Sequence, residues 1–357
     1  MNKKLKFIFL IIFILLVTVS VVSVVYDSIL VLENQKLNVL SSKVKLQYDE
    51  NGKFKVLTIA DVHANGTLPE NVKNNIETLV EREKPNLVIF TGDNTITNSP
   101  NKVRSSLESM VEYIEKLQIP WCHVYGNHDD ESGVSKEIQQ VIYESFDYCV
   151  SKRGESQLTG VGNYVLPVYK YNSHEVASLV WCLDSGTYLN TLDQTRQPDP
   201  EDIYVERPNS PYAYIHQDQI EWYKNTSMML EEKFNKKLPS LMAFHIPLQE
   251  SYYAWIQRES LEEWTGEKHE NVAASRFNSG LFDVLVERKD VLAVVNGHDH
   301  INDFMVKYQD IRLCYSPNVS TLTYFEEYMM GGRVFIFDQN DLTDVETYVS
   351  YLFRNQK

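Results

Sequence analysis

Five short polar segments of this chain hold residue types that bind metal ions. They are Asp61-Val62-His63, Gly92-Asp93-Asn94, Gly126-Asn127-His128-Asp129, His245 and Gly297-His298-Asp299-His300. Side chains two positions apart on an extended backbone point the same way, so Asp61 can act with His63, and His298 with His300. Carboxylates, imidazoles and one carboxamide, without a thiolate, suit Mn, Fe or Zn at a reactive site better than a structural zinc cage.

The ligand candidates exceed the needs of one ion. Two ions that share a bridging carboxylate would use the whole set, which is Asp61, His63, Asp93, Asn127, His245, His298 and His300. Asp299 stands between two histidines and should point to the opposite side, so it is left out of the set. Asn127 could simply form a turn after Gly126, but its place in the block favours a metal-binding carboxamide.

The order of the blocks resembles the calcineurin-like metallophosphoesterase family, whose pattern is D-x-H, G-D, G-N-H-[DE], a lone His and G-H-x-H. The blocks span Asp61 to His300. A single D-x-H or G-D is close to chance, whereas five ordered blocks form a strong signal. The resemblance implies an enzyme that hydrolyses a phosphomonoester or a phosphodiester with two bound metal ions, which activate water and clamp the phosphoryl oxygens.

The resemblance also implies a role for each site residue. One metal would take Asp61, His63, Asp93 and His300, and the other would take Asp93, Asn127, His245 and His298. His128 would face the leaving group and stabilise or protonate the departing oxygen. Asp129 would either orient His128 or act as an N-cap ahead of a helix, and both interpretations stay open.

Two later segments, Gly297 to Phe304 and Leu183 to Gly186, resemble a branch near the purple acid phosphatases. The chain departs from those enzymes at two places. Their tyrosine ligand lies three positions after the G-D aspartate, where this chain has Ile96, and their first block is D-x-G, where this chain has Asp61-Val62-His63. We therefore expect no tyrosinate-to-iron colour.

Each block follows an apolar, strand-like run, and helix-like runs alternate with these strands. The strands are Lys55 to Ala60, Leu87 to Thr91, Trp121 to Tyr125, Leu241 to Phe244 and Val291 to Val295. The helices are Pro69 to Arg82, Val103 to Leu117, Lys136 to Ser145, Gln217 to Glu232 and Ser279 to Glu287. This alternation predicts an α/β fold in which ligands collect beyond the carboxyl ends of the strands.

Two further stretches predict antiparallel strands. Tyr164 to Tyr169 and Val176 to Trp181 flank a short polar connection and read as a hairpin, and Arg333 to Asp338 and Val345 to Leu352 read as strands near the C-terminus. Together with the resemblance they predict a mixed sandwich of two sheets flanked by helices. The segment Asp193 to Pro211, rich in Pro and Asp, predicts a long surface loop.

The N-terminus predicts a membrane anchor. Lys3, Lys4 and Lys6 precede an apolar run from Phe7 to Tyr26, long enough to cross a bilayer. Acidic residues follow the run, so the N-terminus should stay cytoplasmic and the rest should be extracytoplasmic. A cleaved signal peptide and a secreted domain are the alternative. The predicted organisation is an anchor over residues 1–27, a stalk over 28–50 and the metallophosphoesterase domain over 51–357.

Composition limits the partners. The formal net charge is −15, with 49 acidic and 34 basic residues, which argues against general nucleic-acid binding. A small phosphorylated substrate remains compatible, because bound cations can dominate the local field. Cys122 and Cys182 lie in strand-like runs and predict core thiols. The competing functional hypothesis is a catalytically silent, membrane-anchored binding protein on the same fold; intact ligand blocks argue against it.

Overall fold

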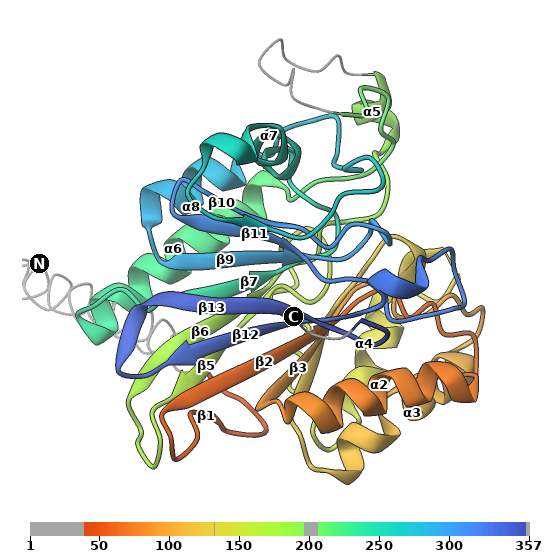
Figure 1. Ribbon diagram of the computed structural model, residues 1–357, viewed down its shortest axis with the longest axis horizontal. Coiled ribbons are helices and arrows are strands. Elements are labelled where there is room, and N and C mark those ends of the chain that lie inside the picture. The colour runs from red at the N-terminus through yellow and green to blue at the C-terminus, as the bar shows by residue number, and fades with distance from the viewer. Residues whose placement is uncertain (1–38, 132, 196–205, 355–357) are drawn as a thin grey trace, which may run out of the picture. The chain divides into compact units, whose positions relative to one another are not determined.

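The computed structural model describes residues 39–131, 133–195 and 206–354. The predicted anchor over residues 1–27 and residues 28–38 of the predicted stalk lie outside this part of the chain. None of the helices in the described part has the length and apolar character that a membrane crossing requires. From Ser42 onward the chain forms one unit, in which two sheets face each other and helices cover their outer faces (Figure 1).

The smaller sheet carries the first three polar blocks. In spatial order it holds β13 (Asp341–Tyr351), β12 (Gly331–Asp338), β2 (Lys53–Ile59), β3 (Leu87–Thr91) and β4 (Trp121–Val124). The last three run parallel, with Ile59 opposite Phe90 and Thr91 opposite Val124. Their carboxyl ends therefore meet at one edge of the sheet, where the polar blocks begin.

The larger sheet carries the other two blocks. Its strands, in spatial order, are β1 (Leu46–Gln47), β5 (Tyr164–Tyr169), β6 (Val176–Cys182), β7 (Ser240–Ala243), β9 (Val291–Asn296), β11 (Ile311–Tyr315), β10 (Met305–Tyr308) and β8 (Trp264–Thr265). Strands β7 and β9, which precede His245 and Gly297, are parallel neighbours. Strand β1 lies inside the segment predicted as a stalk, so the sheet begins before residue 51. A strand of two residues is too short to leave a periodic signal.

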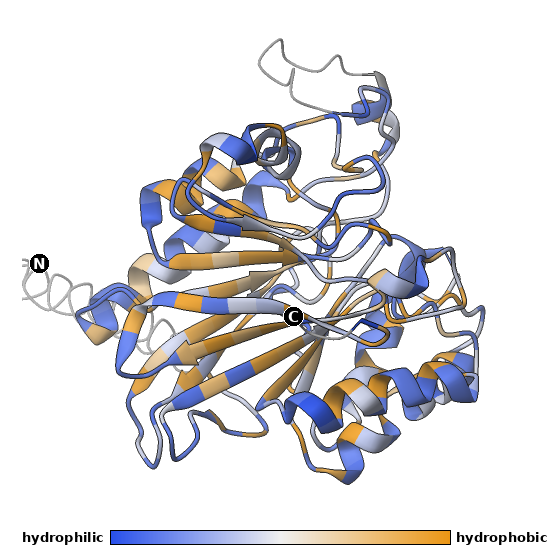
Figure 2. Cartoon of the chain, viewed as in Figure 1, coloured by the Kyte–Doolittle hydropathy of each residue, from blue (hydrophilic) through white to orange (hydrophobic). Residues whose placement is uncertain are grey.

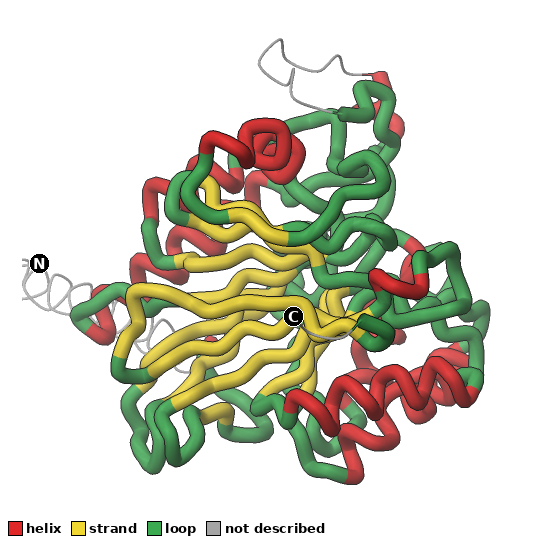
Figure 3. Tube along the Cα trace, viewed as in Figure 1, coloured by secondary structure: helices red, strands yellow, loops and turns green. Residues whose placement is uncertain are grey.

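Helices cover the outer faces of both sheets (Figure 3). The smaller sheet is covered by α2 (Glu70–Glu83), α3 (Pro100–Lys116) and α4 (Lys136–Glu144). The larger sheet is covered by α6 (Gln217–Phe234), α7 (Gln249–Gln257) and α8 (Leu281–Arg288). The short helix α5 (Thr191–Thr195) overlaps the start of the segment predicted as a loop, and residues 196–205 of that segment are not described.

Two apolar cores follow from the alternation of side chains along β2. Phe54 and Val56 point into the layer between the sheets, whereas Leu57 and Ile59 point to the helices α2 and α3. Figure 2 shows apolar residues concentrated on the strands and on the inward faces of the helices. The four cysteines are free and buried, as predicted for Cys122 and Cys182.

The predicted fold class, a mixed two-sheet α/β sandwich flanked by helices, is confirmed. The predicted strands that precede the blocks are present, with ends displaced by at most two residues. The predicted hairpin is the antiparallel pair of β5 and β6. The sequence did not predict α7 or the two-residue strand β8.

Candidate metal centre

The strand ends bring the predicted ligands into two overlapping groups. Asp61, His63, Asp93 and His300 have donor atoms within 4.8 Å of one another, and so do Asp93, His245 and His298. Every member of both groups is buried. Since Asp93 belongs to both groups, the arrangement fits two neighbouring ions that share one carboxylate.

Left-handed backbone turns aim several of these side chains. Asp61, His63, Asp93 and His298 have φ values of 58°, 51°, 51° and 78°, a region that residues other than glycine seldom adopt. Such conformations cost free energy and concentrate at functional sites. After β2, β3 and β9 the chain thus turns sharply, and these turns direct the polar side chains into the cluster.

Two glycines allow the blocks to approach one another closely. A Cβ atom at Gly126 would overlap the carboxylate and the backbone nitrogen of Asp93, and one at Gly92 would overlap the ring of His245. Gly92 also has a φ of 97°. A side chain at either position would push Asp93 or His245 out of the cluster.

Hydrogen bonds to the backbone orient two of the imidazoles. His245 Nδ1 donates to the carbonyl of Thr91 at 2.9 Å, and His300 Nδ1 donates to the carbonyl of Tyr324 at 3.1 Å. The opposite ring nitrogens then face carboxylates: His245 Nε2 lies 3.2 Å from Asp93 Oδ2, and His300 Nε2 lies 3.5 Å from Asp61 Oδ1. A metal-binding histidine usually donates one ring nitrogen to a backbone carbonyl and turns the other to the metal, so this arrangement aims both Nε2 atoms at the carboxylates of the cluster.

Three atoms of the cluster that could bind a metal are buried and have no hydrogen-bond partner. They are His63 Nε2, Asn127 Oδ1 and His298 Nε2. Buried polar atoms are nearly always satisfied, so three orphans in one cluster need an explanation. Metal ions bound to these atoms would satisfy them, and the mixture of carboxylate, imidazole and carboxamide fits Mn, Fe or Zn.

The cluster also concentrates negative charge. Burial raises the pKa of each carboxyl, but His300 beside Asp61 and His245 beside Asp93 outweigh it and hold both pKa values below their ordinary range. In the described part of the chain only histidines pair with these carboxylates, and no lysine or arginine does. Two buried carboxylates are costly without a compensating charge, which metal ions would supply.

The histidines differ in charge. Burial lowers the pKa of His63 to about 4 and, together with repulsion from His245, lowers that of His298 to about 3. Burial lowers the pKa of His245 as well, but Asp93 outweighs it and raises this pKa to about 9. His63 and His298 are therefore neutral and offer a lone pair, the form that binds a metal.

Asp129 and His128 have different surroundings from the predicted ones. The Asp129 carboxylate is buried and accepts hydrogen bonds from the backbone nitrogens of Gly126 (2.8 Å), Thr95 (2.8 Å) and Asn94 (3.3 Å), and so links the loops after β3 and β4. The partner of the His128 ring is Glu131, whose Oε2 lies 2.6 Å from His128 Nδ1. Of the two interpretations left open for Asp129, the contact that orients His128 is made by Glu131, and the Asp129 carboxylate instead binds backbone nitrogens.

Asp299 points away from the cluster, as predicted. Its carboxylate accepts hydrogen bonds from the Tyr315 hydroxyl at 2.5 Å and from the backbone nitrogen of Ala273 at 3.1 Å. Burial raises the pKa of Asp299 to about 8. The residue anchors the turn that carries His298 and His300.

Sequence reasoning missed three residues at the edge of the cluster. Glu131 contacts His128, Tyr188 donates a hydrogen bond to Glu131 at 2.5 Å, and the Tyr324 ring stacks on His300 with a centroid distance of 4.2 Å. The three-residue spacing from His128 to Glu131 was a usable signal. Tyr188 and Tyr324 are distant in sequence from their partners, and no local pattern marks them.

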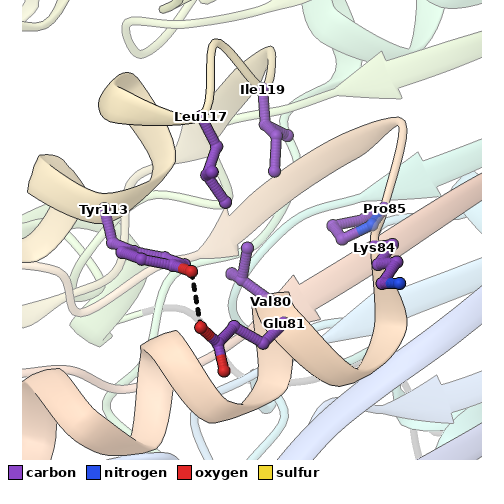
Figure 4. Close-up of a pocket in the computed structure, with 7 residues that line it drawn as sticks. All are labelled: Val80, Glu81, Lys84, Pro85, Tyr113, Leu117 and Ile119. Carbon is purple, nitrogen blue, oxygen red and sulfur yellow. Dashed lines mark hydrogen bonds between the residues drawn. The ribbon is translucent and has the colours of Figure 1, made fainter.

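A surface hollow of about 610 Å³ lies elsewhere, between the C-terminal ends of α2 and α3 (Figure 4). Tyr113 donates a hydrogen bond to Glu81 at 2.6 Å within it. Its lining residues are Val80, Glu81, Lys84, Pro85, Tyr113, Leu117 and Ile119. None of them belongs to a polar block, so this hollow is not the site of the predicted chemistry.

Known proteins resemble this chain over most of its length. The plant protein "Probable inactive purple acid phosphatase 29" from Arabidopsis thaliana is 30% identical over 331 residues, covering 83% of this chain and 79% of its own. "Phosphatase DCR2" from Saccharomyces cerevisiae is 31% identical over 307 residues, covering 76% of this chain and 49% of its own.

Among solved structures, "GAP50 the anchor in the inner membrane complex of Plasmodium" matches the fold with a TM-score of 0.52 at 11% identity, covering 85% of this chain and 86% of its own. The family model described as calcineurin-like phosphoesterase matches residues 54–302, which include all five blocks. The chain therefore belongs to the calcineurin-like phosphoesterase family.

Proposed function

We propose that this chain hydrolyses a phosphomonoester or a phosphodiester with two bound metal ions. The observation that carries the proposal is the pair of buried donor groups that meet at Asp93. His63, Asn127 and His298 each add a buried donor atom without a partner. A purely structural cluster would not leave these atoms without partners, and it would gain nothing from burying two carboxylates within 4.8 Å of each other.

The proposed ligands of one ion are Asp61, His63, Asp93 and His300, and those of the other are Asp93, Asn127, His245 and His298. When bound, the ions would polarise the phosphoryl group and provide hydroxide from water near neutral pH. The protein fixes the geometry: backbone carbonyls orient His245 and His300, and the backbone nitrogen of His298 donates to Asp61 at 3.1 Å.

His128 is the proposed acid for the leaving group. Its ring lies beside the cluster, 5.1 Å from the His63 ring between centroids, yet its side chain is 38% exposed. Its Nδ1 is engaged by Glu131, which leaves Nε2 as the nitrogen that can give a proton to a departing oxygen. Exposure matters here, because a leaving group must reach the ring from solvent.

The proposed substrate is a small phosphorylated molecule. The net charge of −15 disfavours nucleic acid as a general partner. We further propose, from the apolar run Phe7 to Tyr26 and the lysines before it, that the domain is extracytoplasmic and held at a membrane, with a cleaved and secreted form as the alternative.

A second candidate function is a silent binding protein on the same fold. The names of the plant relatives favour it, since three of them are called probable inactive purple acid phosphatases. The yeast relative is named a phosphatase, which favours hydrolysis. The complete donor set of this chain, with no ligand position lost, is the reason to prefer the enzyme.

The test is hydrolysis by the purified full-length chain. It should be assayed with Mn, Fe or Zn against a panel of phosphomonoesters, phosphodiesters and nucleotides, beside Asp93→Asn and a matched control, Asp283→Asn, at an exposed position of α8. We expect metal-dependent turnover that Asp93→Asn abolishes and Asp283→Asn retains. Metal binding without turnover of any member of the panel would favour the silent binding protein.

A further inference from the structure

Glu131 lies outside the five blocks, yet both of its carboxylate oxygens are engaged at the edge of the centre. Oε2 accepts a hydrogen bond from His128 Nδ1 at 2.6 Å. Oε1 accepts one from the Tyr188 hydroxyl at 2.5 Å. An ionised carboxylate can only accept, so the proton between His128 and Glu131 belongs to Nδ1. This contact fixes which nitrogen of His128 faces away from Glu131.

Tyr188 is itself held firmly. It forms an isolated antiparallel bridge with Tyr212, and the two rings stack with a centroid distance of 5.7 Å. The backbone nitrogen of Leu189 donates to the carbonyl of Pro211 at 2.7 Å. The hydroxyl of Thr187 donates to Asp130 at 3.2 Å. The segment that carries Tyr188 is therefore tied both to residues 211–212 and to the turn that carries His128.

The same contacts reach the metal centre. The Tyr212 ring meets His298 edge-on at a centroid distance of 4.3 Å. Tyr188 thus connects Tyr212, which packs on the proposed ligand His298, with Glu131, which is hydrogen-bonded to the proposed acid His128. A shift of His128 relative to the centre would have to break this chain of contacts.

The hydrogen bond from Tyr188 to Glu131 matters because the pair of His128 and Glu131 is exposed. The side chains of His128 and Glu131 are 38% and 43% exposed, and exposed ion pairs are weakly held on their own. The bond from Tyr188 restricts the Glu131 carboxylate to one orientation. Burial raises the pKa of Glu131, but the bonds from Tyr188 and His128 outweigh it and lower this pKa, so the group is an anion near neutral pH.

We propose that Glu131 and Tyr188 act as a positioning pair, which holds His128 with Nε2 directed at the leaving oxygen of the substrate. The proposal rests on the hydrolase function proposed above. Neither residue touches the reacting atoms in this role. Their effect should be confined to steps that need proton donation by His128, and it should therefore depend on the leaving group.

Kinetics on two substrates test the pair. In the full-length chain, Glu131→Ala should lower kcat for an alkyl phosphate by about 10–10²-fold, part of the 10²–10⁴-fold that acid catalysis contributes. An activated substrate, 4-nitrophenyl phosphate, should be affected less. Glu131→Gln keeps an acceptor and should retain more activity, and Tyr188→Phe should show a smaller loss of the same kind. KM and metal content should stay near wild type.

Matched controls separate positioning from general damage. Glu137→Gln alters an exposed glutamate at the start of α4, and Tyr171→Phe alters an exposed tyrosine between β5 and β6. Both should keep wild-type rates. In a His128→Ala background, Glu131→Ala should add less than about twofold, because residues that act through one group are not additive. An equal loss on both substrates, or a full additional loss in that background, would overturn the positioning role.

A readout that does not depend on turnover follows the hydrogen bond itself. In the zinc-loaded full-length chain with ¹⁵N-labelled histidine, the Nδ1 proton of His128 should give a downfield signal that His128→Ala removes. Glu131→Ala should remove or strongly shift it, and Glu137→Gln should not. If wild type turns over substrate but Glu131→Ala leaves the signal unchanged, the positioning role of Glu131 and Tyr188 is wrong, whereas the proposed hydrolase function is retained. If wild type turns over no phosphoester, the hydrolase function is wrong and the positioning role is lost with it.

Discussion

Asp93 connects every part of the candidate centre through a single carboxylate. Oδ2 lies 3.2 Å from His245 Nε2 and 3.7 Å from His63 Nε2. These two histidines belong to different metal-ligand groups, and Asp93 belongs to both. Oδ1 accepts a hydrogen bond from the backbone nitrogen of His128 at 2.8 Å. The residue proposed to bridge the ions therefore also fixes the turn that carries the proposed acid. A shift of Asp93 would disturb both metal binding and the position of His128.

Replacing His128 should separate catalysis from metal binding. We expect His128→Ala to lower turnover of an alkyl phosphate by about 10²–10⁴-fold, since the proposed general acid is lost. An activated aryl phosphate needs less help and should lose less. Metal content, measured by elemental analysis, should stay near wild type, because no proposed ligand is removed.

The matched control is His174→Ala, an exposed histidine in the turn between β5 and β6, which should change neither quantity. Loss of bound metal in His128→Ala would show that this residue is a ligand. Wild-type rates on both substrates would show that it has no part in the reaction.

The sequence predicted the site residues that lie in the five short polar segments. Asp61 with His63 and His298 with His300 could be found because each pair lies in a short polar block just after a strand, although left-handed turns and not an extended backbone aim their side chains. Tyr188 could not, because its contact with Glu131 crosses 57 positions and depends on how the loop after β6 folds back. Asp129 lies beside His128 in sequence, but its carboxylate accepts hydrogen bonds from the backbone nitrogen of Gly126 in its own turn and from those of Asn94 and Thr95 in the loop after β3.

Helix α4 illustrates how an element is fixed near the centre. It begins at Lys136, whose buried ammonium contacts both oxygens of Asp184 at 2.9 and 3.1 Å, just beyond the end of β6. Asp184 also accepts from the backbone nitrogens of Val161 (2.9 Å) and Gly186 (3.0 Å). This ion pair ties the helix that follows the His128 turn to the larger sheet.

Breaking the pair should destabilise the fold. Lys136→Met leaves a buried carboxylate without its cation, a change that typically costs about 3–5 kcal/mol of unfolding free energy. Denaturant unfolding would measure it, with Lys116→Met at the exposed end of α3 as the control. If the two variants were equally stable, the ion pair would have no structural importance.

Long, periodic elements were predictable and short ones were not. The strands before the blocks have continuous apolar runs because both of their faces are buried. The strands β1 and β8 pair over only two residues at the edges of the larger sheet, so their positions depend on neighbours and not on their own sequence. Helix α7 was missed since it follows the His245 block without a cap residue that hydrogen-bonds its first turn.

At the scale of the whole molecule, the N-terminal run predicts where the domain resides. We expect residues beyond Tyr26 to be labelled by a membrane-impermeant reagent on intact cells, because lysines precede the run and acidic residues follow it. Mass analysis of the N-terminus should find the run uncleaved. Protection of the domain from the reagent would contradict the orientation, and a mature chain that starts near Asp27 would contradict the anchor.

The central claim is a two-metal centre that shares Asp93, and the metal content of the reconstituted full-length chain tests it most directly. Elemental analysis should give two ions per chain for wild type and for the surface control Asp283→Asn. His63→Ala and His298→Ala, which each remove a ligand from one group only, should each retain about one ion, and Asp93→Asn should weaken both sites. A single ion per wild-type chain, with Asp61→Ala leaving that content unchanged, would contradict the two-metal account.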